Sequence, residues 1–192
     1  MKLIFTSYGF QSPVVCDKLR DSIDTDGKRM FIIPCAGFDS IGTGAREKKA
    51  AVRFGFEENK VYIFDEACPE VCKGMVFDYV YVSGGDPFKL LSAVRKYGLN
   101  ETIKRCRTYI GVSAGAYIAC GDIEYVKLLE DDDYIFDDYI GLGLFNGRII
   151  CHYDLYGSGV YSQCRMAYPD GVFYTLENGQ AAVVEKNEWE YI

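Results

Sequence analysis

The segment Gly111-Val112-Ser113-Ala114-Gly115 has the pattern Gly-x-Ser-x-Gly, in which a serine can act as a nucleophile. An apolar run leads into it, and a helical stretch from Ala114 to Cys120 follows. A sharp strand-to-helix turn would lift the Ser113 hydroxyl above the end of a sheet, and the unpaired N–H groups that open the helix would face a developing oxyanion. The chemistry predicted is acyl transfer. The pattern alone also fits an ordinary turn or a helix N-cap, so its context has to decide.

The chain contains one histidine, His152, so any serine hydrolase of the Ser–His type in this sequence must use it. His152 directly follows an apolar run that ends at Cys151. An open α/β sheet places its functional groups at such strand ends. The alternative is a surface or core histidine without a catalytic role. The coincidence with the serine pattern favours Ser113 and His152 as a catalytic pair.

A carboxylate would be needed to hold the imidazole of His152 in one tautomer and to stabilise its charged form. Glu124 and the acidic run Glu130-Asp131-Asp132-Asp133 lie between Ser113 and His152, and Asp154 follows His152 by two residues. Asp154 is less attractive, because at a strand end it would point the same way as His152 without necessarily reaching its ring. The acidic run is most simply a solvated loop. Spacing alone does not choose among these carboxylates.

The elements that must position these residues alternate along the chain. Near-continuous apolar runs are typical of strands buried on both faces of a parallel sheet, and they predict strands at 2–6, 29–34, 60–64, 78–82 and 108–112. Helical patterns between the strands predict helices at 13–22, 45–55, 87–97 and 99–106. The alternation predicts an α/β fold, with a doubly wound, mostly parallel sheet and helices on both faces.

The pattern changes after residue 145. Asn178-Gly179, between two apolar runs, indicates a C-terminal β-hairpin. The expected elements here are strands at 147–151, 172–176, 181–185 and 188–192 and a short helix at 158–167. No repeat or linker interrupts the sequence, so residues 1–192 are interpreted as a single domain.

Three of the predicted strands end in unusual sequence. The functional crevice of an open α/β sheet lies beyond the carboxyl ends of its strands. One end is Val82-Ser83-Gly84-Gly85-Asp86-Pro87, whose paired glycines let the backbone approach a ligand closely. The other two are the serine pattern at 111–115 and the segment Ile149-Ile150-Cys151-His152-Tyr153-Asp154. The sequence therefore predicts one crevice built from these three ends.

The composition argues against several classes of function. The formal charge of −7 and the pI near 4.8, with scattered lysines and arginines, argue against a nucleic-acid partner. No stretch approaches the ~20 apolar residues that span a bilayer. The apolar run after Met1 is too short for the core of a signal peptide. We therefore expect a cytoplasmic protein without a membrane role.

The eight cysteines are expected to be reduced, because no secretory signal accompanies them and most lie inside apolar segments. Cys68-Pro69-Glu70-Val71-Cys72 has three residues between its cysteines, instead of the two of a redox or zinc motif. The chain also offers only His152 as an imidazole ligand. Neither a metal nor an organic cofactor is expected.

The three strand ends together resemble the peptidase E family of serine peptidases, the aspartyl dipeptidase group that includes cyanophycinase-like enzymes. The resemblance spans roughly residues 1–190 and keeps the order of the motifs. The matching stretches are 82–91, 111–116, Gly141-Leu142-Gly143-Leu144 leading to His152-Tyr153, and 176–184. The resemblance implies a fold like that of class I glutamine amidotransferases, with a serine where those enzymes use cysteine.

The resemblance also implies roles for individual residues. Ser113 would be the nucleophile, His152 the general base, and the N–H groups of Gly85 and Ala114 the oxyanion hole. For the acid, Glu124 is narrowly preferred, with Glu130 and Asp131 behind it. The activity implied is hydrolysis of short peptides through an acyl-enzyme, without a cofactor. A homodimer is a further hypothesis.

Two positions depart from the family pattern, and both concern substrate binding. The family turn usually continues Gly-Gly-Asn-Thr, whereas this chain has Asp86-Pro87 after its glycines, which brings a carboxylate near the expected oxyanion. Aspartyl dipeptidases hold the substrate's aspartate with an arginine after the catalytic histidine, and only Arg165 is available here. Asp86 and Arg165 are thus the candidate substrate-binding residues. Asp86 also motivates an alternative hypothesis, an impaired family member that binds a small amino-acid-like ligand or a protein partner.

Overall fold

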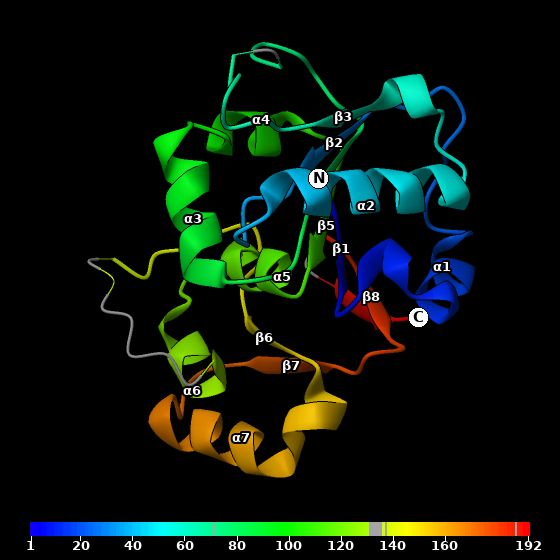
Figure 1. Cartoon of the computed structure of the whole chain (residues 1–192). Helices are drawn as coiled ribbons and strands as arrows, with labels where there is room; N and C mark the ends of the chain where they lie inside the picture. The colour runs from blue at the N-terminus through cyan, green and yellow to red at the C-terminus, as the bar shows by residue number, and fades with distance from the viewer. Residues whose placement is uncertain (71, 131–135, 137, 187) are drawn as a thin grey trace.

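The computed structural model describes residues 1–70, 72–130, 136, 138–186 and 188–192. A seven-stranded sheet runs through the centre in the order β3-β2-β4-β5-β1-β8-β9 (Figure 1). The strands from β3 to β1 are parallel, whereas β8 is antiparallel to β1 and β9 to β8. Their bounds are β1 Lys2–Thr6, β2 Met30–Ile33, β3 Val61–Ile63, β4 Tyr79–Val82, β5 Thr108–Val112, β8 Ala181–Glu185 and β9 Glu188–Tyr191.

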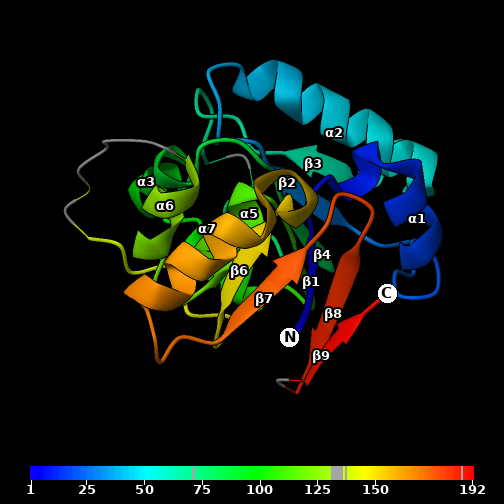
Figure 2. The ribbon, with the colours of Figure 1, turned by 90° about the horizontal axis from the view of Figure 1, so that it is seen from below.

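Helices cover both faces of this sheet (Figure 2). Successive side chains of a strand point to opposite faces, and in β1 Ile4 belongs to one apolar core while Leu3 and Phe5 belong to the other. The core of Ile4 is closed by α1 (Pro13–Leu19) and α2 (Ser40–Phe54). The core of Phe5 is closed by α3 (Pro87–Lys96), α4 (Asn100–Arg105) and α5 (Ala114–Ala119). Burial on both faces explains the near-continuous apolar runs, and the doubly wound α/β prediction is confirmed.

The chain after α5 builds a second, smaller layer. The strands β6 (Arg148–Cys151) and β7 (Phe173–Leu176) form a separate two-stranded parallel sheet. The helix α7 (Tyr153–Ala167) connects them and lies beside them in Figure 2. The short helices η3 (Glu124–Val126) and α6 (Lys127–Glu130) precede this unit. The small sheet therefore brings its carboxyl ends, and with them His152, toward the large sheet.

The hairpin predicted around Asn178-Gly179 is not formed. β7 pairs with β6, and β8 pairs with β1 and β9, so the strands on either side of this turn belong to different sheets. The C-terminal hairpin joins β8 to β9, with Glu185 opposite Glu188. The local preference of Asn-Gly for a hairpin turn is therefore overridden by the long-range pairing of the two flanking strands.

Polar N-caps fix the starts of α1, α2 and α3. The side chains of Ser12, Asp39 and Asp86 accept hydrogen bonds from N–H groups in the first turns of α1, α2 and α3. The remaining short helices are η1 (Gly9–Gln11) and η2 (Glu58–Lys60). In the described part of the chain, no helix combines the length and the apolar character that a membrane crossing requires.

Candidate active site

Ser113 stands at a sharp turn between β5 and α5. Its backbone has φ +48° and ψ −109°, a conformation that side-chain-bearing residues rarely adopt. The flanking glycines make the turn sterically feasible: a β-carbon on Gly111 would lie 2.7 Å from the carbonyl oxygen of Gly115, and one on Gly115 would lie 2.2 Å from that of Val82. The Ser113 N–H donates to the Thr6 carbonyl at 2.9 Å, which ties the turn to β1. The strand-turn-helix context predicted for the Gly-x-Ser-x-Gly pattern is therefore present.

His152 lies directly opposite this serine. Its Nε2 is 3.1 Å from the Ser113 Oγ, within hydrogen-bonding distance. His152 also has a left-handed backbone, with φ +56° and ψ +34°, between the end of β6 and the start of α7. Its N–H donates to the Ser7 hydroxyl at 3.0 Å, and that hydroxyl donates to the Leu176 carbonyl at 3.1 Å. The two sheets thus meet at the histidine.

The other ring nitrogen of His152 faces an amide instead of a carboxylate. Its Nδ1 is 2.7 Å from the Asn178 Oδ1. Behind the amide lies Asp154, whose carboxylate accepts the Asn178 backbone N–H at 3.0 Å and the Nδ2–H at 2.8 Å. The row of side chains is therefore Ser113, His152, Asn178 and Asp154.

Glu124, the acid preferred from sequence, is not in this row. It lies in η3, and its carboxylate is 3.4 Å from the Lys127 ammonium. Glu130 is exposed at the end of α6, and its charge adds to burial in raising the pKa of Tyr156. Asp131 lies outside the described residues. The residue on the Nδ1 side of His152 is Asn178, and no contact of His152 with Glu124 joins that carboxylate to this row.

Sequence reasoning missed Asn178 because Asn-Gly was assigned to a hairpin turn. A usable signal existed nevertheless. If the strand at 173–176 runs parallel to the strand at 148–151, their carboxyl ends lie side by side, as the pairing of Cys151 with Leu176 shows. The residues after Leu176 then come next to His152. A parallel instead of an antiparallel assignment of this strand would have pointed to Asn178.

Gly85 and Ala114 offer two N–H groups next to the serine. Ala114 is the first residue of α5, and Gly84 lies so close to Ser113 that a β-carbon on it would be 3.1 Å from the serine's. Gly85 has φ +131°, which favours glycine. Neither the Gly85 N–H nor the Ala114 N–H donates a hydrogen bond to any described residue. Both donors remain available to a substrate oxygen.

The carboxylate of Asp86 is occupied by its own helix. It accepts hydrogen bonds from the N–H groups of Phe88 at 2.8 Å and Lys89 at 3.0 Å, and it is 3.3 Å from the Lys89 ammonium. Helix N-terminus and lysine both offset its negative charge. The structure thus gives Asp86 a capping contact and no contact with Ser113 or His152.

Arg165 does not reach the site. It lies in the last turn of α7, whereas His152 caps the first, and its guanidinium donates to the Gly171 carbonyl. The structure therefore does not bring Arg165 together with Ser113 and His152.

The thiols of Cys120, at the end of α5, and of Cys151, at the end of β6, are poor nucleophiles. Burial raises the pKa of Cys120 to about 12 and the pKa of Cys151 above its usual range. Both thiols therefore stay protonated at neutral pH. In the described part of the chain no three His, Cys, Asp or Glu side chains gather as metal ligands. Ser113 is the nucleophile that this geometry favours.

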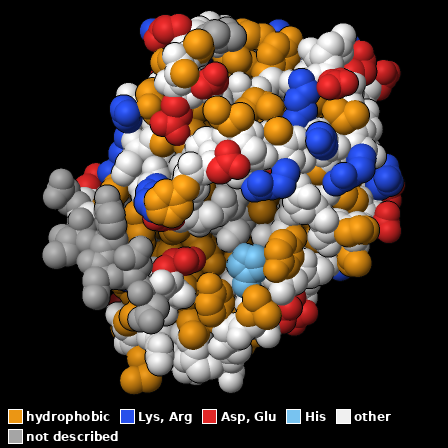
Figure 3. All heavy atoms as spheres, viewed as in Figure 1, with side chains coloured by type: hydrophobic (Ala, Val, Ile, Leu, Met, Phe, Trp, Pro, Cys, Tyr) orange, Lys and Arg blue, Asp and Glu red, His pale blue; other side chains and the backbone are white. Residues whose placement is uncertain are grey.

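The imidazole is accessible from outside. In Figure 3 the pale-blue histidine lies at the edge of a hollow in the surface, with apolar side chains around it. The exposed ring of Tyr8 contacts the imidazole edge-on, with centroids 5.2 Å apart. The histidine side chain is therefore reachable from solvent.

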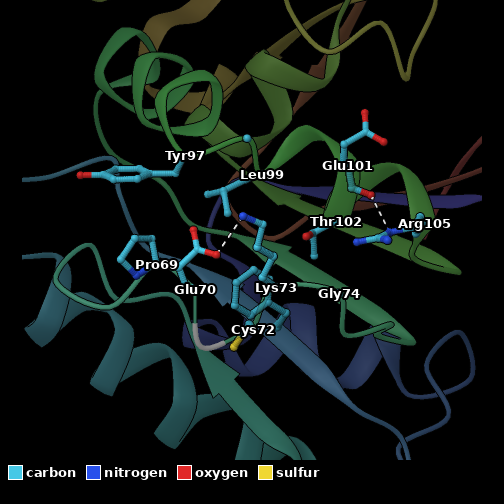
Figure 4. Close-up of a pocket in the computed structure, with 12 residues that line it drawn as sticks. Pro69, Glu70, Cys72, Lys73, Gly74, Tyr97, Leu99, Glu101, Thr102 and Arg105 are labelled. Carbon is cyan, nitrogen blue, oxygen red and sulfur yellow. Dashed lines mark hydrogen bonds and ion pairs between the residues drawn. The ribbon is translucent and has the colours of Figure 1, made fainter.

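A second hollow, of about 380 Å³, lies elsewhere (Figure 4). It is lined by residues of α4 and of the turn before it, by Phe31 of β2, and by Pro69, Glu70, Cys72, Lys73 and Gly74. Among its charged side chains, Glu70 pairs with Lys73 at 2.9 Å, and the Arg105 guanidinium donates to the backbone carbonyl of Glu101 at 3.1 Å. None of the predicted site residues lines it. The site at Ser113 is distinct from this hollow.

Known proteins share sequence and fold with this chain. The family described as Peptidase family S51 matches residues 6–192. An uncharacterized peptidase of Listeria monocytogenes is 29% identical over 163 residues, 80% of this chain and 79% of its own. One of Pasteurella multocida is 34% identical over 82 residues, 40% of each chain. A crystal structure of a candidate peptidase E protein from Listeria monocytogenes has a TM-score of 0.76 at 22% identity, covering 100% of this chain and 97% of that one. At such identity the likeness shows the shared fold.

Proposed function

The chain belongs to peptidase family S51, and on this basis we propose that it is a serine peptidase with Ser113 as nucleophile and His152 as general base. One observation carries the proposal: the 3.1 Å contact between the His152 Nε2 and the Ser113 Oγ, at a left-handed elbow flanked by glycines. A serine hydroxyl becomes a useful nucleophile only when a base can take its proton. His152 is the chain's one histidine, and it lies at the required distance.

The reaction follows from these positions. The Ser113 Oγ attacks the scissile carbonyl carbon while its proton passes to the His152 Nε2. The negative charge that develops on the carbonyl oxygen is stabilised by the N–H groups of Gly85 and Ala114. The protonated Nε2 then gives its proton to the departing amine, which leaves an acyl-enzyme. A water molecule, deprotonated by the same nitrogen, releases the acid and restores the serine.

The substrates we infer are short peptides with a free N-terminus, cleaved in the cytoplasm by a monomer or a homodimer. The resemblance of the strand-end motifs to dipeptidases of the peptidase E group supports this substrate class. Specificity for an N-terminal aspartate is not part of the proposal, because Arg165 is engaged with Gly171 at the far end of α7. A panel of dipeptides and tripeptides with varied first residues is the direct measurement of preference.

Labelling with a fluorophosphonate tests the proposed nucleophile. The probe reacts only with an activated serine, so we expect stoichiometric labelling of the folded protein and its loss in Ser113→Ala. Ser162→Ala is the matched control, since Ser162 is exposed on α7 and its hydroxyl donates to the Ser158 carbonyl. Unlabelled folded protein, together with no turnover of any peptide in the panel, would favour the impaired, ligand-binding alternative.

A further inference from the structure

The partner of the His152 Nδ1 is an amide that carries no charge, and a carboxylate lies directly behind it. Asp154 accepts two hydrogen bonds from Asn178, one from the backbone N–H at 3.0 Å and one from the Nδ2–H at 2.8 Å. No lysine or arginine of the described residues forms an ion pair with Asp154. Its contacts with Asn178 are therefore not shared with a competing cation.

The two contacts fix which way the amide of Asn178 points. An ionised carboxylate only accepts hydrogen bonds, so the atom of the amide that faces Asp154 must be the nitrogen. The amide oxygen then faces His152, at 2.7 Å from Nδ1. The reversed amide would set its oxygen against the carboxylate, acceptor against acceptor. Asp154 thus selects one of the two orientations of the Asn178 side chain.

The orientation of Asn178 in turn fixes the tautomer of His152. An amide oxygen only accepts hydrogen bonds, so the Nδ1 that faces it must carry the proton. In a neutral imidazole the other nitrogen is then unprotonated. That nitrogen, Nε2, is the one 3.1 Å from the Ser113 Oγ, and it can accept the serine proton. The Asp154 carboxylate therefore sets the orientation of the Asn178 amide, and that orientation sets the tautomer of His152.

We propose that Asp154 is a positioning residue, which acts through Asn178 to hold His152 in the Nδ1–H tautomer and places a negative charge behind the imidazole when it becomes cationic. The inference rests on the proposed serine peptidase. In a Ser-His-Asp triad one carboxylate orients the imidazole and stabilises its charged form. Here the Asn178 amide and the Asp154 carboxylate would share these two roles. Asp154 touches neither the substrate nor the reacting atoms.

The single histidine allows a direct test. In protein labelled with 15N-histidine, every imidazole signal comes from His152. At alkaline pH, where the ring is neutral, we expect the Nδ1–H tautomer in the wild type and a mixture in Asp154→Asn, because an asparagine at 154 can pair with either orientation of Asn178. Asp154→Glu keeps a carboxylate, so we expect a larger fraction of the Nδ1–H tautomer in this variant than in Asp154→Asn. Glu177→Gln removes one charge from the same turn, where the exposed carboxylate forms no hydrogen bond or ion pair with a described residue, and should leave the spectrum unchanged.

Kinetics give the second readout. We expect Asp154→Asn to lower kcat by about 10- to 100-fold, with little change in KM and an unchanged melting temperature. Glu177→Gln should match the wild type.

Two spectroscopic results would overturn the proposal. One is a wild-type protein whose His152 is in the Nε2–H tautomer, and the other is an unaltered tautomer in folded Asp154→Asn. Should Asp154→Asn not fold, the wild-type spectrum and Asp154→Glu still decide. The spectra need no turnover, so failure of the fluorophosphonate test would refute the proposed function separately from this inference.

Discussion

Gly85 lies so close to Ala36 that a β-carbon on it would be 2.5 Å from the Ala36 carbonyl oxygen. The same oxygen accepts the Asp86 N–H at 2.7 Å, so the loop after β4 is fastened to the loop after β2. Gly85→Ala must therefore move the backbone that carries one of the two oxyanion donors. We expect kcat to fall by about 10²- to 10³-fold, the range for loss of one such donor. Steady-state kinetics on a dipeptide measures the change.

Gly98→Ala is the control for backbone strain. Gly98 also has a positive φ, +64°, but nothing lies within 4 Å of its missing β-carbon, and it lies in the turn between α3 and α4. We expect it to lose about 1 kcal/mol of unfolding free energy with unchanged kcat. If Gly85→Ala loses stability but no activity, Gly85 does not supply an oxyanion donor.

Asp86→Asn distinguishes an active peptidase from an impaired one. Because the carboxylate caps α3 and pairs with Lys89, its removal should change kcat/KM no more than a few-fold. Asparagine is an equally good N-cap, so stability should hold, whereas Asp86→Ala should cost about 1 kcal/mol. Kinetics and urea unfolding of both variants check this. A tenfold or larger gain in Asp86→Asn would show that the negative charge suppresses catalysis.

Exchanging Asn178 and Asp154 tests whether the two side chains act as a hydrogen-bonded pair. Asn178→Asp alone sets two carboxylates where the amide and carboxylate now lie 2.8 Å apart, and like charges there should lower both stability and kcat. The double variant Asp154→Asn/Asn178→Asp restores a donor opposite an acceptor. We expect it to recover most of the lost kcat, which a double-mutant cycle quantifies. Strictly additive effects would mean that the two residues act independently.

The buried carboxylate of Glu47 should make stability depend on pH. Burial raises its pKa above the ordinary 4.5, although the Tyr81 hydroxyl at 2.8 Å and the Gln11 amide lower it in part. The folded state therefore favours the protonated form. This contribution is present below pH 4.5 and is lost as the pH rises through the raised folded value.

Glu47→Gln keeps an acceptor for Tyr81 and removes the ionisation. Urea unfolding at a series of pH values should show its stability, relative to wild type, rising above pH 4.5, by about 1.4 kcal/mol for each unit by which the folded pKa is raised. Glu58→Gln, at an exposed position of η2, is the control and should follow the wild type. A difference that is flat with pH would mean that folding does not raise the pKa of Glu47.

Cys68 should be the one thiol that reacts quickly with a chromogenic disulfide reagent. It is exposed, whereas burial raises the pKa of Cys35, Cys106 and Cys120 to about 12. Cys16 is half-buried and should react more slowly. Native protein should therefore show one fast equivalent, and Cys68→Ser none. A fast equivalent that persists in Cys68→Ser would place a second thiol at the surface.

The sequence was most informative where burial dictates residue type. The strands from β1 to β5 were predicted to within about one residue, because burial on both faces leaves only apolar runs. Ser113 was identifiable because its turn excludes side chains at Gly111 and Gly115. His152 was identifiable because the chain has no other histidine.

The partner of His152 was not predictable by the same reasoning. Asn178 reaches the ring because β7 pairs with β6 in parallel, and that pairing depends on contacts between residues far apart in the chain. The local preference of Asn-Gly pointed to a hairpin instead. Glu124 and Arg165 have suitable chemistry, but local contacts with Lys127 and Gly171 hold them elsewhere. Residue type and spacing can identify a functional residue at the end of a predicted strand. They do not identify a residue that long-range strand pairing brings to the site.

The antiparallel pairing of β8 with β1 has a consequence for how the protein is made. Asn178 lies just before β8, and β8 closes on the first strand of the chain, Leu3 opposite Val184. Synthesis from the N-terminus therefore makes Ser113 and His152 before Asn178, the residue that contacts the imidazole Nδ1. We expect the imidazole to be held by Asn178 only after β8 has paired with the first strand of the chain.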